Sequence, residues 1–249
     1  RVQEVTDYDY ALVHLFEESD EYWMKFQRSK AIGREIILDN SIFELGEAFE
    51  ADMFYPWIEK LMPEWYIIPD ALEDAEKTVK NAKEWQHIAG CKTIGVAQGK
   101  TYEEMVWCYK EIEPLVDKVG ISFDYCFFVD EDLNGKLPTK FHHYMYGRDA
   151  MIHRMLADGV INENKPHHLL GCGLPQEFES YRGYKWIDSL DTSNPVVPLF
   201  AKAVANGFWN VNGFLFISYK PPNCCVAGAF KATCCAFLSH SCAVGILFA

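Results

Sequence analysis

Basic residues are scarce in this chain of 249 residues, which carries 23 Lys and Arg against 36 Asp and Glu and has a formal net charge of -13. Neutralising the phosphates of a nucleic acid needs clustered Lys and Arg, so this balance argues against loose electrostatic adhesion to DNA or RNA. A basic patch of limited size is still compatible with the composition. Binding to nucleic acid is therefore restricted to a local groove.

Hydrophobic stretches of signal-peptide length are also lacking in residues 1–20, which are acidic. We expect no signal peptide. The first four of the nine cysteines stand singly in apolar segments, as buried free thiols do: Cys91, Cys108, Cys126 and Cys172. This usage predicts a reducing, cytoplasmic environment.

Acidic residues are absent from residues 201–249, which hold three Lys and five of the nine Cys. We expect residues 1–206 to form the body of the protein and residues 207–249 to be an atypical Cys-rich segment. This segment is either the last unit of the fold or a foreign tail. Lys231 and His240 interrupt its apolar end, so we expect no membrane anchor. Eight residues separate its two Cys-Cys pairs, which does not match zinc-knuckle spacing, so we expect no metal site.

Apolar residues, in contrast, are plentiful, at 49% hydrophobic and 15% aromatic, which is enough for a sizeable core. Short apolar runs alternate with longer amphipathic ones, one of which opens with a Thr101 and Glu104 capping box. The pattern predicts an α/β fold, with a (β/α)₈ TIM-type barrel favoured and an open doubly wound sheet as the alternative. The expected strands are 10–15, 35–39, 65–70, 92–99, 118–125, 167–173 and 185–191, and residues 207–216 can supply an eighth.

Polar residues and glycines follow the ends of these expected strands. In a parallel barrel the catalytic groups sit where strands end and loops begin, so we expect these residues to converge on one rim. Any single Asp can instead cap the following helix. The residues are Asp39, Asp70, Gln98, Asp124, Gly171, Gly173, Asp188 and Asp191.

Two carboxylates beside one small pocket suit the chemistry of a glycosidic bond. One carboxylate attacks or stabilises the anomeric carbon while the other shuttles a proton. Phe43 either stacks on a flat ligand or belongs to the core, and Asp70 with Gln98 can hydrogen-bond the edge of a nucleobase. The spacing alone does not say which bond is broken.

Five segments between residues 8 and 200 resemble, in order and spacing, the motifs of tRNA-guanine transglycosylases. The residues of these segments are more similar still to a phage branch that resembles 7-deazaguanine DNA transglycosylases. Those enzymes insert deazaguanine bases into DNA. LDNSIFE (38–44) is similar to T-D-S-G-G-F-Q, IIPDALED (67–74) to the base-binding Asp strand, GVAQG (95–99) to G-I-V-Q-G, HLLGCG (168–173) to the glycine-rich base-binding turn, and IDSLDTS (187–193) to V-D-x-F-D-C-V.

The resemblance implies a covalent base exchange without a cofactor, in the cytoplasm of a phage-infected bacterial host. Asp191 would attack C1′ of a guanosine, and Asp39 would take the N9 proton of the incoming 7-deazaguanine. The other expected site residues would bind the base: Phe43, Asp70, Gln98, Gly171, Gly173 and Asp188. The partners implied are a 7-deazaguanine base and DNA, with tRNA less favoured and no membrane.

The chain departs from the family at several points. The C-x-C-x₂-C…H zinc site is absent, Asn40 replaces Ser, and Ser41 with Ile42 replaces the Gly-Gly pair. These differences favour DNA over tRNA. Two other functions stay open, namely a TIM-barrel hydrolase or lyase that uses the same carboxylates and a non-catalytic DNA-binding barrel. We expect the adjacent His167 and His168 to be packing or surface residues on opposite faces of a strand.

Overall fold

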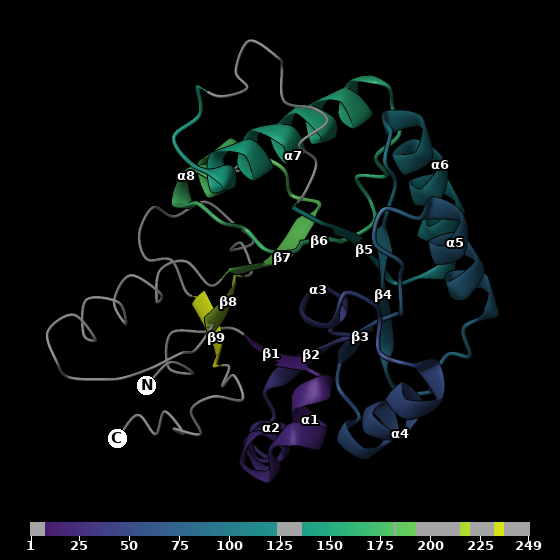
Figure 1. Ribbon diagram of the computed structural model, residues 1–249, viewed down its shortest axis with the longest axis vertical. Helices are drawn as coiled ribbons and strands as arrows, with labels where there is room; N and C mark the ends of the chain where they lie inside the picture. The colour runs from purple at the N-terminus through teal and green to yellow at the C-terminus, as the bar shows by residue number, and fades with distance from the viewer. Residues whose placement is uncertain (1–7, 124–135, 182, 193–214, 220–231, 237–249) are drawn as a thin grey trace, which may run out of the picture.

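The computed structural model describes residues 8–123, 136–181, 183–192, 215–219 and 232–236. Seven strands pair in parallel in the order of the sequence and form a nearly closed ring (Figure 1). The expected α/β fold with a barrel-like parallel sheet is therefore confirmed. The strands are β1 (Tyr8–Leu12), β2 (Glu35–Asp39), β3 (Trp65–Ile67), β4 (Lys92–Ala97), β5 (Lys118–Ile121), β6 (His167–Leu169) and β7 (Ile187–Thr192).

Helices follow the strands in alternation, and most of them cover the outside of the ring (Figure 1). None of the helices in the described ranges is long and apolar enough to cross a membrane. The helices are α1 (His14–Glu18), α2 (Asp20–Ala31), α3 (Ile42–Leu45), α4 (Ala51–Leu61), α5 (Ala75–Glu84), α6 (Tyr102–Ile112), the 3₁₀ helix η2 (Glu113–Leu115), α7 (Lys140–Ala157) and α8 (Pro175–Ser180).

Side-chain caps fix the starts of several helices. The hydroxyl of Thr101 accepts a hydrogen bond from the backbone N–H of Glu104 at 3.2 Å, as the expected capping box requires. The Glu104 carboxylate reaches back to the N–H of Lys100 at 2.7 Å, one residue earlier than in a standard box. Helix α6 therefore begins where the sequence predicts.

Two short strands extend the sheet beyond β7. Strand β8 (Leu215–Tyr219) pairs with β7, β9 (Ala232–Ala236) pairs with β8, and both pairings are antiparallel. Among the described residues there is no eighth parallel strand of the kind expected near residues 207–216. The rest of the Cys-rich segment 207–249, together with Asp124, lies outside the described residues.

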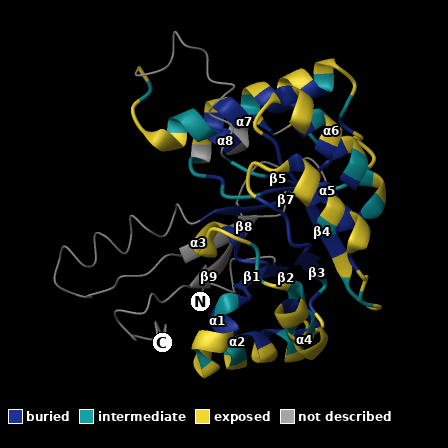
Figure 2. Cartoon of the chain, turned by 45° about the vertical axis from the view of Figure 1, so that its right-hand side comes forward, coloured by how far each residue is buried: buried dark blue, intermediate teal, exposed yellow. Residues whose placement is uncertain are grey.

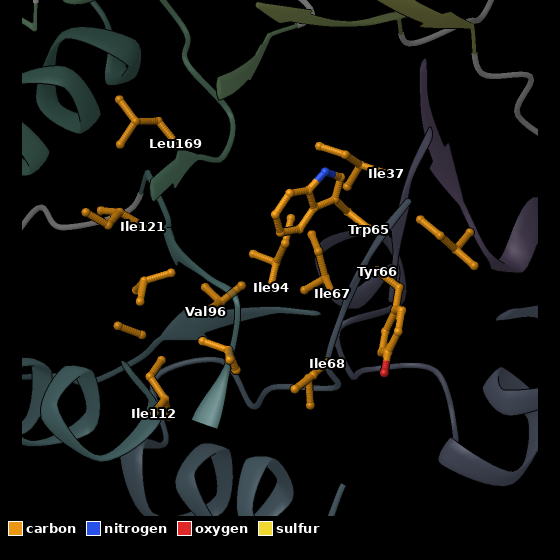
Figure 3. Packing of buried hydrophobic residues seen from close by; sticks show 14 of the residues in the cluster. Ile37, Trp65, Tyr66, Ile67, Ile68, Ile94, Val96, Ile112, Ile121 and Leu169 are labelled. Carbon is orange, nitrogen blue, oxygen red and sulfur yellow. The ribbon is translucent and has the colours of Figure 1, made fainter. Parts of the chain in front are cut away.

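The apolar core occupies both faces of the strands. Ile36, Ile37 and Leu38 of β2 are all fully buried, which matches the expectation that this strand is covered on both sides. Figure 3 shows Trp65 on one side of β3 and Tyr66 on the other, as the alternation of a strand dictates. Figure 2 shows the buried residues along the strands and the exposed ones on the outer surfaces of the helices. Part of the core therefore lies inside the ring of strands, and part lies between the strands and the helices.

Candidate active site

Asp39 is the last residue of β2, and only 7% of its surface is exposed. Its Oδ2 accepts a hydrogen bond from the Tyr10 hydroxyl at 2.5 Å, and its Oδ1 accepts one from the backbone N–H of Ser41 at 2.5 Å. Burial raises the pKa of the Asp39 carboxyl to about 7; the carboxylates of Asp191 and Asp70 raise it too, whereas the two hydrogen bonds lower it. Asp39 can therefore gain or lose a proton near neutral pH.

Asp191 lies near the end of β7 and is 2% exposed. Its Oδ2 accepts a hydrogen bond from the backbone N–H of Gly171 at 3.0 Å, and its Oδ1 lies 3.2 Å from Nε2 of His168. The backbone carbonyl of Asp191 accepts from the N–H of Cys172 at 2.8 Å. The side chain and backbone of Asp191 are thus both fixed against the turn that follows β6.

Tyr10 and His168 connect the two carboxylates. The Tyr10 hydroxyl bonds Asp39, while its ring stacks on the imidazole of His168 at 6.0 Å between centroids, with 14° between the planes. Burial raises the pKa of Tyr10 well above its ordinary value, and the charges of Asp39 and then Asp191 add to this shift. Both carboxylates therefore face one interior, at the carboxyl ends of β2 and β7.

Asp70 and Gln98 form a direct pair just beyond the ends of β3 and β4. Asp70 Oδ2 accepts a hydrogen bond from Gln98 Nε2 at 2.7 Å, and its Oδ1 accepts from Asn40 Nδ2 at 2.7 Å. All three side chains are buried, and burial raises the pKa of the Asp70 carboxyl. Because Asn40 follows Asp39 directly, this polar group lies beside the first carboxylate.

The turn at residues 171–173 requires its glycines. Gly171 has a φ of +60°, and a Cβ placed there would lie 2.3 Å from the Phe123 ring. A Cβ at Gly173 would lie 2.8 Å from the ring of Phe141. The backbone therefore approaches these aromatic rings closely and can direct the Gly171 N–H at Asp191.

A buried arginine holds the turn at residues 171–173 through several polar contacts. Arg148 of α7 forms an ion pair with Glu177 at 2.6 Å, and both side chains are 1% exposed. The guanidinium also donates to the carbonyls of Ser122 at 3.1 Å and of Leu170, and to Sγ of Cys172 at 3.1 Å. Arg148 thus ties the ends of β5 and β6 together, which holds the turn in place.

Phe43 lies on the short helix α3 and is 63% exposed, so it is not a core residue. Its ring meets that of Phe123 at 5.1 Å with 72° between the planes. Just before it, Ser41 adopts a left-handed backbone with a φ of +62°, a conformation that favours glycine. The loop after Asp39 therefore has a glycine-like conformation at Ser41, one of the two positions where the motif that it resembles has glycine.

Asp188 is the expected site residue that the structure does not bring to this rim. Its carboxylate accepts a hydrogen bond at 2.6 Å from Nζ of Lys118, the first residue of β5. The same ammonium lies 4.0 Å from the ring centroid of Trp65, the first residue of β3. Three residues of extended strand span roughly 10 Å, so Asp188 lies toward the amino ends while Asp191 lies toward the carboxyl ends.

Sequence reasoning missed two residues of the site, Tyr10 and His168. The expectation that the two histidines face opposite ways agrees with their contacts, because His167 bonds Tyr109 of α6 and His168 bonds Asp191. His168 is buried and packs on Tyr10, in agreement with one half of the expectation, but its ring also bonds Ser189 and Asp191. Among the described residues, no cluster of three or more His, Cys, Asp or Glu side chains could hold a metal ion.

Comparisons of the chain with models of protein families and with curated proteins find no match. The likeness to transglycosylases thus stays a prediction, and the geometry of the rim is the ground on which a function can be proposed.

Proposed function

We propose that this protein is a base-exchange transglycosylase that replaces guanine by a 7-deazaguanine in DNA, on a barrel of the (β/α)₈ type. The observation that carries the proposal is the pair of buried carboxylates, Asp39 and Asp191, joined through Tyr10 and His168 inside one ring of strands. Their environments differ, since Asp39 has a pKa of about 7 and Asp191 is held by two nitrogen atoms. Such a difference suits a proton carrier beside a nucleophile.

The first half of the reaction breaks the bond between C1′ and N9 of a guanosine. An Asp191 oxygen attacks C1′, an ester bond forms, and the electron pair of the broken bond goes to N9 of guanine. The protonated form of Asp39 gives its proton to this nitrogen as guanine leaves. A pKa of about 7 keeps part of the Asp39 population protonated near neutral pH.

The second half reverses these steps with another base. The Asp39 carboxylate removes the N9 proton of a 7-deazaguanine, and N9 attacks C1′ from the face that guanine left. The ester to Asp191 breaks, which returns its carboxylate. Two displacements at C1′ retain the configuration of the sugar, as in retaining glycosidases.

The polar group of Asp70, Gln98 and Asn40 supports selection of the base. The edge of guanine offers N–H donors and a carbonyl acceptor, which match a carboxylate and two amides. These side chains bond one another, which orients each of them. The exposed ring of Phe43 offers a surface for stacking, and a nucleotide must leave the DNA stack to reach it.

The test is incorporation of a labelled base by the purified full chain. The chain is incubated with labelled guanine or a 7-deazaguanine and either DNA or tRNA, and the nucleosides are analysed by mass spectrometry. We expect label in DNA, and we expect Asp191→Asn to reduce its incorporation by at least about 10³-fold because the nucleophile is lost.

A matched control uses the other side of β1. Asp9 is a buried carboxylate that pairs with Arg34 at 3.0 Å, away from the site, and Asp9→Asn should exchange base normally if it folds. Release of guanine without incorporation of a new base would instead indicate a hydrolase. Full exchange by Asp191→Asn would contradict the proposal outright.

A further inference from the structure

A row of buried polar side chains leads from the amino ends of the strands to Asp191. Nζ of Lys118 lies 3.2 Å from Oγ of Ser189, which lies 2.8 Å from Nδ1 of His168. Nε2 of His168 lies 3.2 Å from Oδ1 of Asp191. Each of these four residues is at most 2% exposed, so water does not compete for their hydrogen bonds.

Lys118 and Asp191, at the two ends of the row, determine which atom donates in each of its hydrogen bonds. A Lys ammonium only donates hydrogen bonds, and an ionised carboxylate only accepts them. His168 must therefore donate from Nε2 to Asp191. Burial lowers the pKa of His168, so its ring is neutral near pH 7 and its other nitrogen, Nδ1, is an acceptor. The Ser189 hydroxyl then donates to Nδ1 and accepts from Lys118.

We propose that His168 is a positioning residue for Asp191, held in its Nε2–H form by Lys118 and Ser189. In this arrangement His168 fixes one oxygen of Asp191 while the Gly171 N–H fixes the other. The carboxylate is then aimed before any substrate arrives, which lowers the barrier to attack. The consequence for catalysis rests on the proposed function, whereas the state of the His168 ring does not.

The neighbouring histidine provides an internal reference of the opposite kind. Nδ1 of His167 lies 2.8 Å from the carbonyl oxygen of Lys165, and its Nε2 lies 2.9 Å from the Tyr109 hydroxyl. A carbonyl only accepts, so His167 carries its proton on Nδ1 and accepts from Tyr109 at Nε2. Burial lowers the pKa of His167 to about 4, so this ring is neutral too. Two adjacent histidines are therefore expected in opposite tautomers.

The first test reads the tautomers directly. The full chain is labelled with ¹⁵N-histidine, its ring nitrogens are observed by NMR at pH 7.5, and His167→Gln and His168→Gln assign the signals. We expect Nε2–H for His168 and Nδ1–H for His167. Ser189→Ala should disturb the His168 signals and leave those of His167 unchanged. A His168 ring that is protonated on Nδ1, or on both nitrogens, would overturn the proposal.

The second test measures base exchange by variants of the same position. His168→Phe keeps a ring beside Tyr10 but removes the donor, so kcat should fall by about 10- to 100-fold with little change in KM for DNA. His168→Gln places an amide N–H near the lost Nε2–H and should recover most of this loss. His167→Phe serves as the matched control, because it removes an equally buried imidazole on the other face of β6 and should leave kcat unchanged.

The outcomes separate this inference from the proposed function. Wild-type exchange with an unimpaired His168→Phe would overturn the positioning role and leave the proposed function standing. A wild-type chain without exchange, but with the expected tautomers, would support the hydrogen-bonded row and overturn the proposed function. A wild-type chain that shows neither base exchange nor the expected tautomers would overturn both the positioning role and the proposed function. If His168→Phe does not fold, as judged by its melting curve, the Gln variant and the tautomers still decide the question.

Discussion

Burial changes the chemistry of the Asp39 carboxyl. Its carboxyl accepts two hydrogen bonds, from Tyr10 and Ser41, and these favour the charged form. Burial outweighs them, and the pKa of Asp39 rises to about 7. The same shift that suits a proton carrier also makes the charged form costly to the fold, so function and stability are opposed at this position.

The cost of burying Asp39 can be measured through the dependence of stability on pH. An unfolded Asp titrates near pH 4, whereas Asp39 in the folded protein titrates near pH 7. Between these values the folded state binds more protons than the unfolded state, so the stability due to this group falls as the pH rises. Asp39→Asn removes that loss. We expect the variant to gain stability relative to wild type by on the order of 1–3 kcal/mol between pH 5 and pH 8.

The measurement is denaturant unfolding of both chains at the two pH values. The comparison at pH 5 is the control, because there the wild-type carboxyl is mostly protonated and resembles the amide. Asp39→Asn should meanwhile lose most of its base exchange. A stability difference that is the same at pH 5 and pH 8 would show that the pKa of Asp39 is not raised in the folded protein.

The sequence allowed us to predict the site residues that follow the end of an apolar strand. Asp39, Asp70, Gln98 and Asp191 each stop an apolar run, and all four lie buried at the carboxyl ends of their strands. Tyr10 carries no such mark, because its contact with Asp39 depends on the register between β1 and β2. Register is set by tertiary packing, which a single sequence does not display.

Strand β6 shows how an element carries the site through its backbone. It has only three residues, yet its two histidines face opposite sides and its final turn delivers the Gly171 N–H to Asp191. The pairing of β6 with β7 is irregular: His167 pairs with Ile187 and His168 pairs with Ser189, so β7 has one extra residue between the two pairs. Asp188 is that extra residue, so simple alternation along β7 could not predict where its side chain lies.

The turn after β6 can be tested with two glycines of the same conformation. Gly171 and Gly159 have φ values of +60° and +65°, but only a Cβ at Gly171 meets a side chain within 4 Å. Gly159→Ala should cost about 1 kcal/mol, from the backbone alone. Gly171→Ala should cost about 3 kcal/mol, because the Phe123 ring must also move.

Base exchange should separate the two variants more sharply than stability does. Gly171→Ala shifts the N–H that holds Asp191, so exchange should fall at least tenfold, whereas Gly159→Ala should exchange normally. Thermal unfolding and initial rates measure the two effects. Equal rates for the two variants would mean that the turn does not hold Asp191 in the active protein.

For the protein as a whole, the alternation of apolar runs and helices was enough to predict a parallel, barrel-like sheet. The way in which the ring is completed was not predictable. Of the expected last parallel strand, 207–216, only residues 215 and 216 are described, and they belong to β8, which pairs antiparallel with β7. The tail has no charged pattern that distinguishes a helix from a strand, since residues 201–249 contain no Asp or Glu. The composition indicated where the chain departs from the regular alternation, but not that the strands there pair antiparallel.

The strong negative charge makes a prediction about the binding of DNA. With a net charge of -13, Asp and Glu outnumber Lys and Arg by 36 to 23, so we expect no extensive basic surface to neutralise phosphates. A protein that makes six to ten phosphate contacts loses about 10³- to 10⁵-fold in affinity between 50 and 200 mM salt. We expect the KM for DNA to change by less than about tenfold over this range. A steep loss, measured by base exchange at constant pH, would reveal an extensive basic groove.

The most direct measurement is the capture of the covalent intermediate. The chain is mixed with DNA in the absence of any free base, denatured during turnover, and digested, and the peptides are analysed by mass spectrometry. We predict an adduct of the base-free sugar of the DNA on the peptide that contains Asp191, located on that residue by fragmentation. The adduct should disappear when a 7-deazaguanine is added before denaturation, and it should be absent from Asp191→Asn. An adduct on Asp188 or Asp39, or exchange that proceeds with no adduct on any residue, would contradict the assignment of Asp191 as the nucleophile.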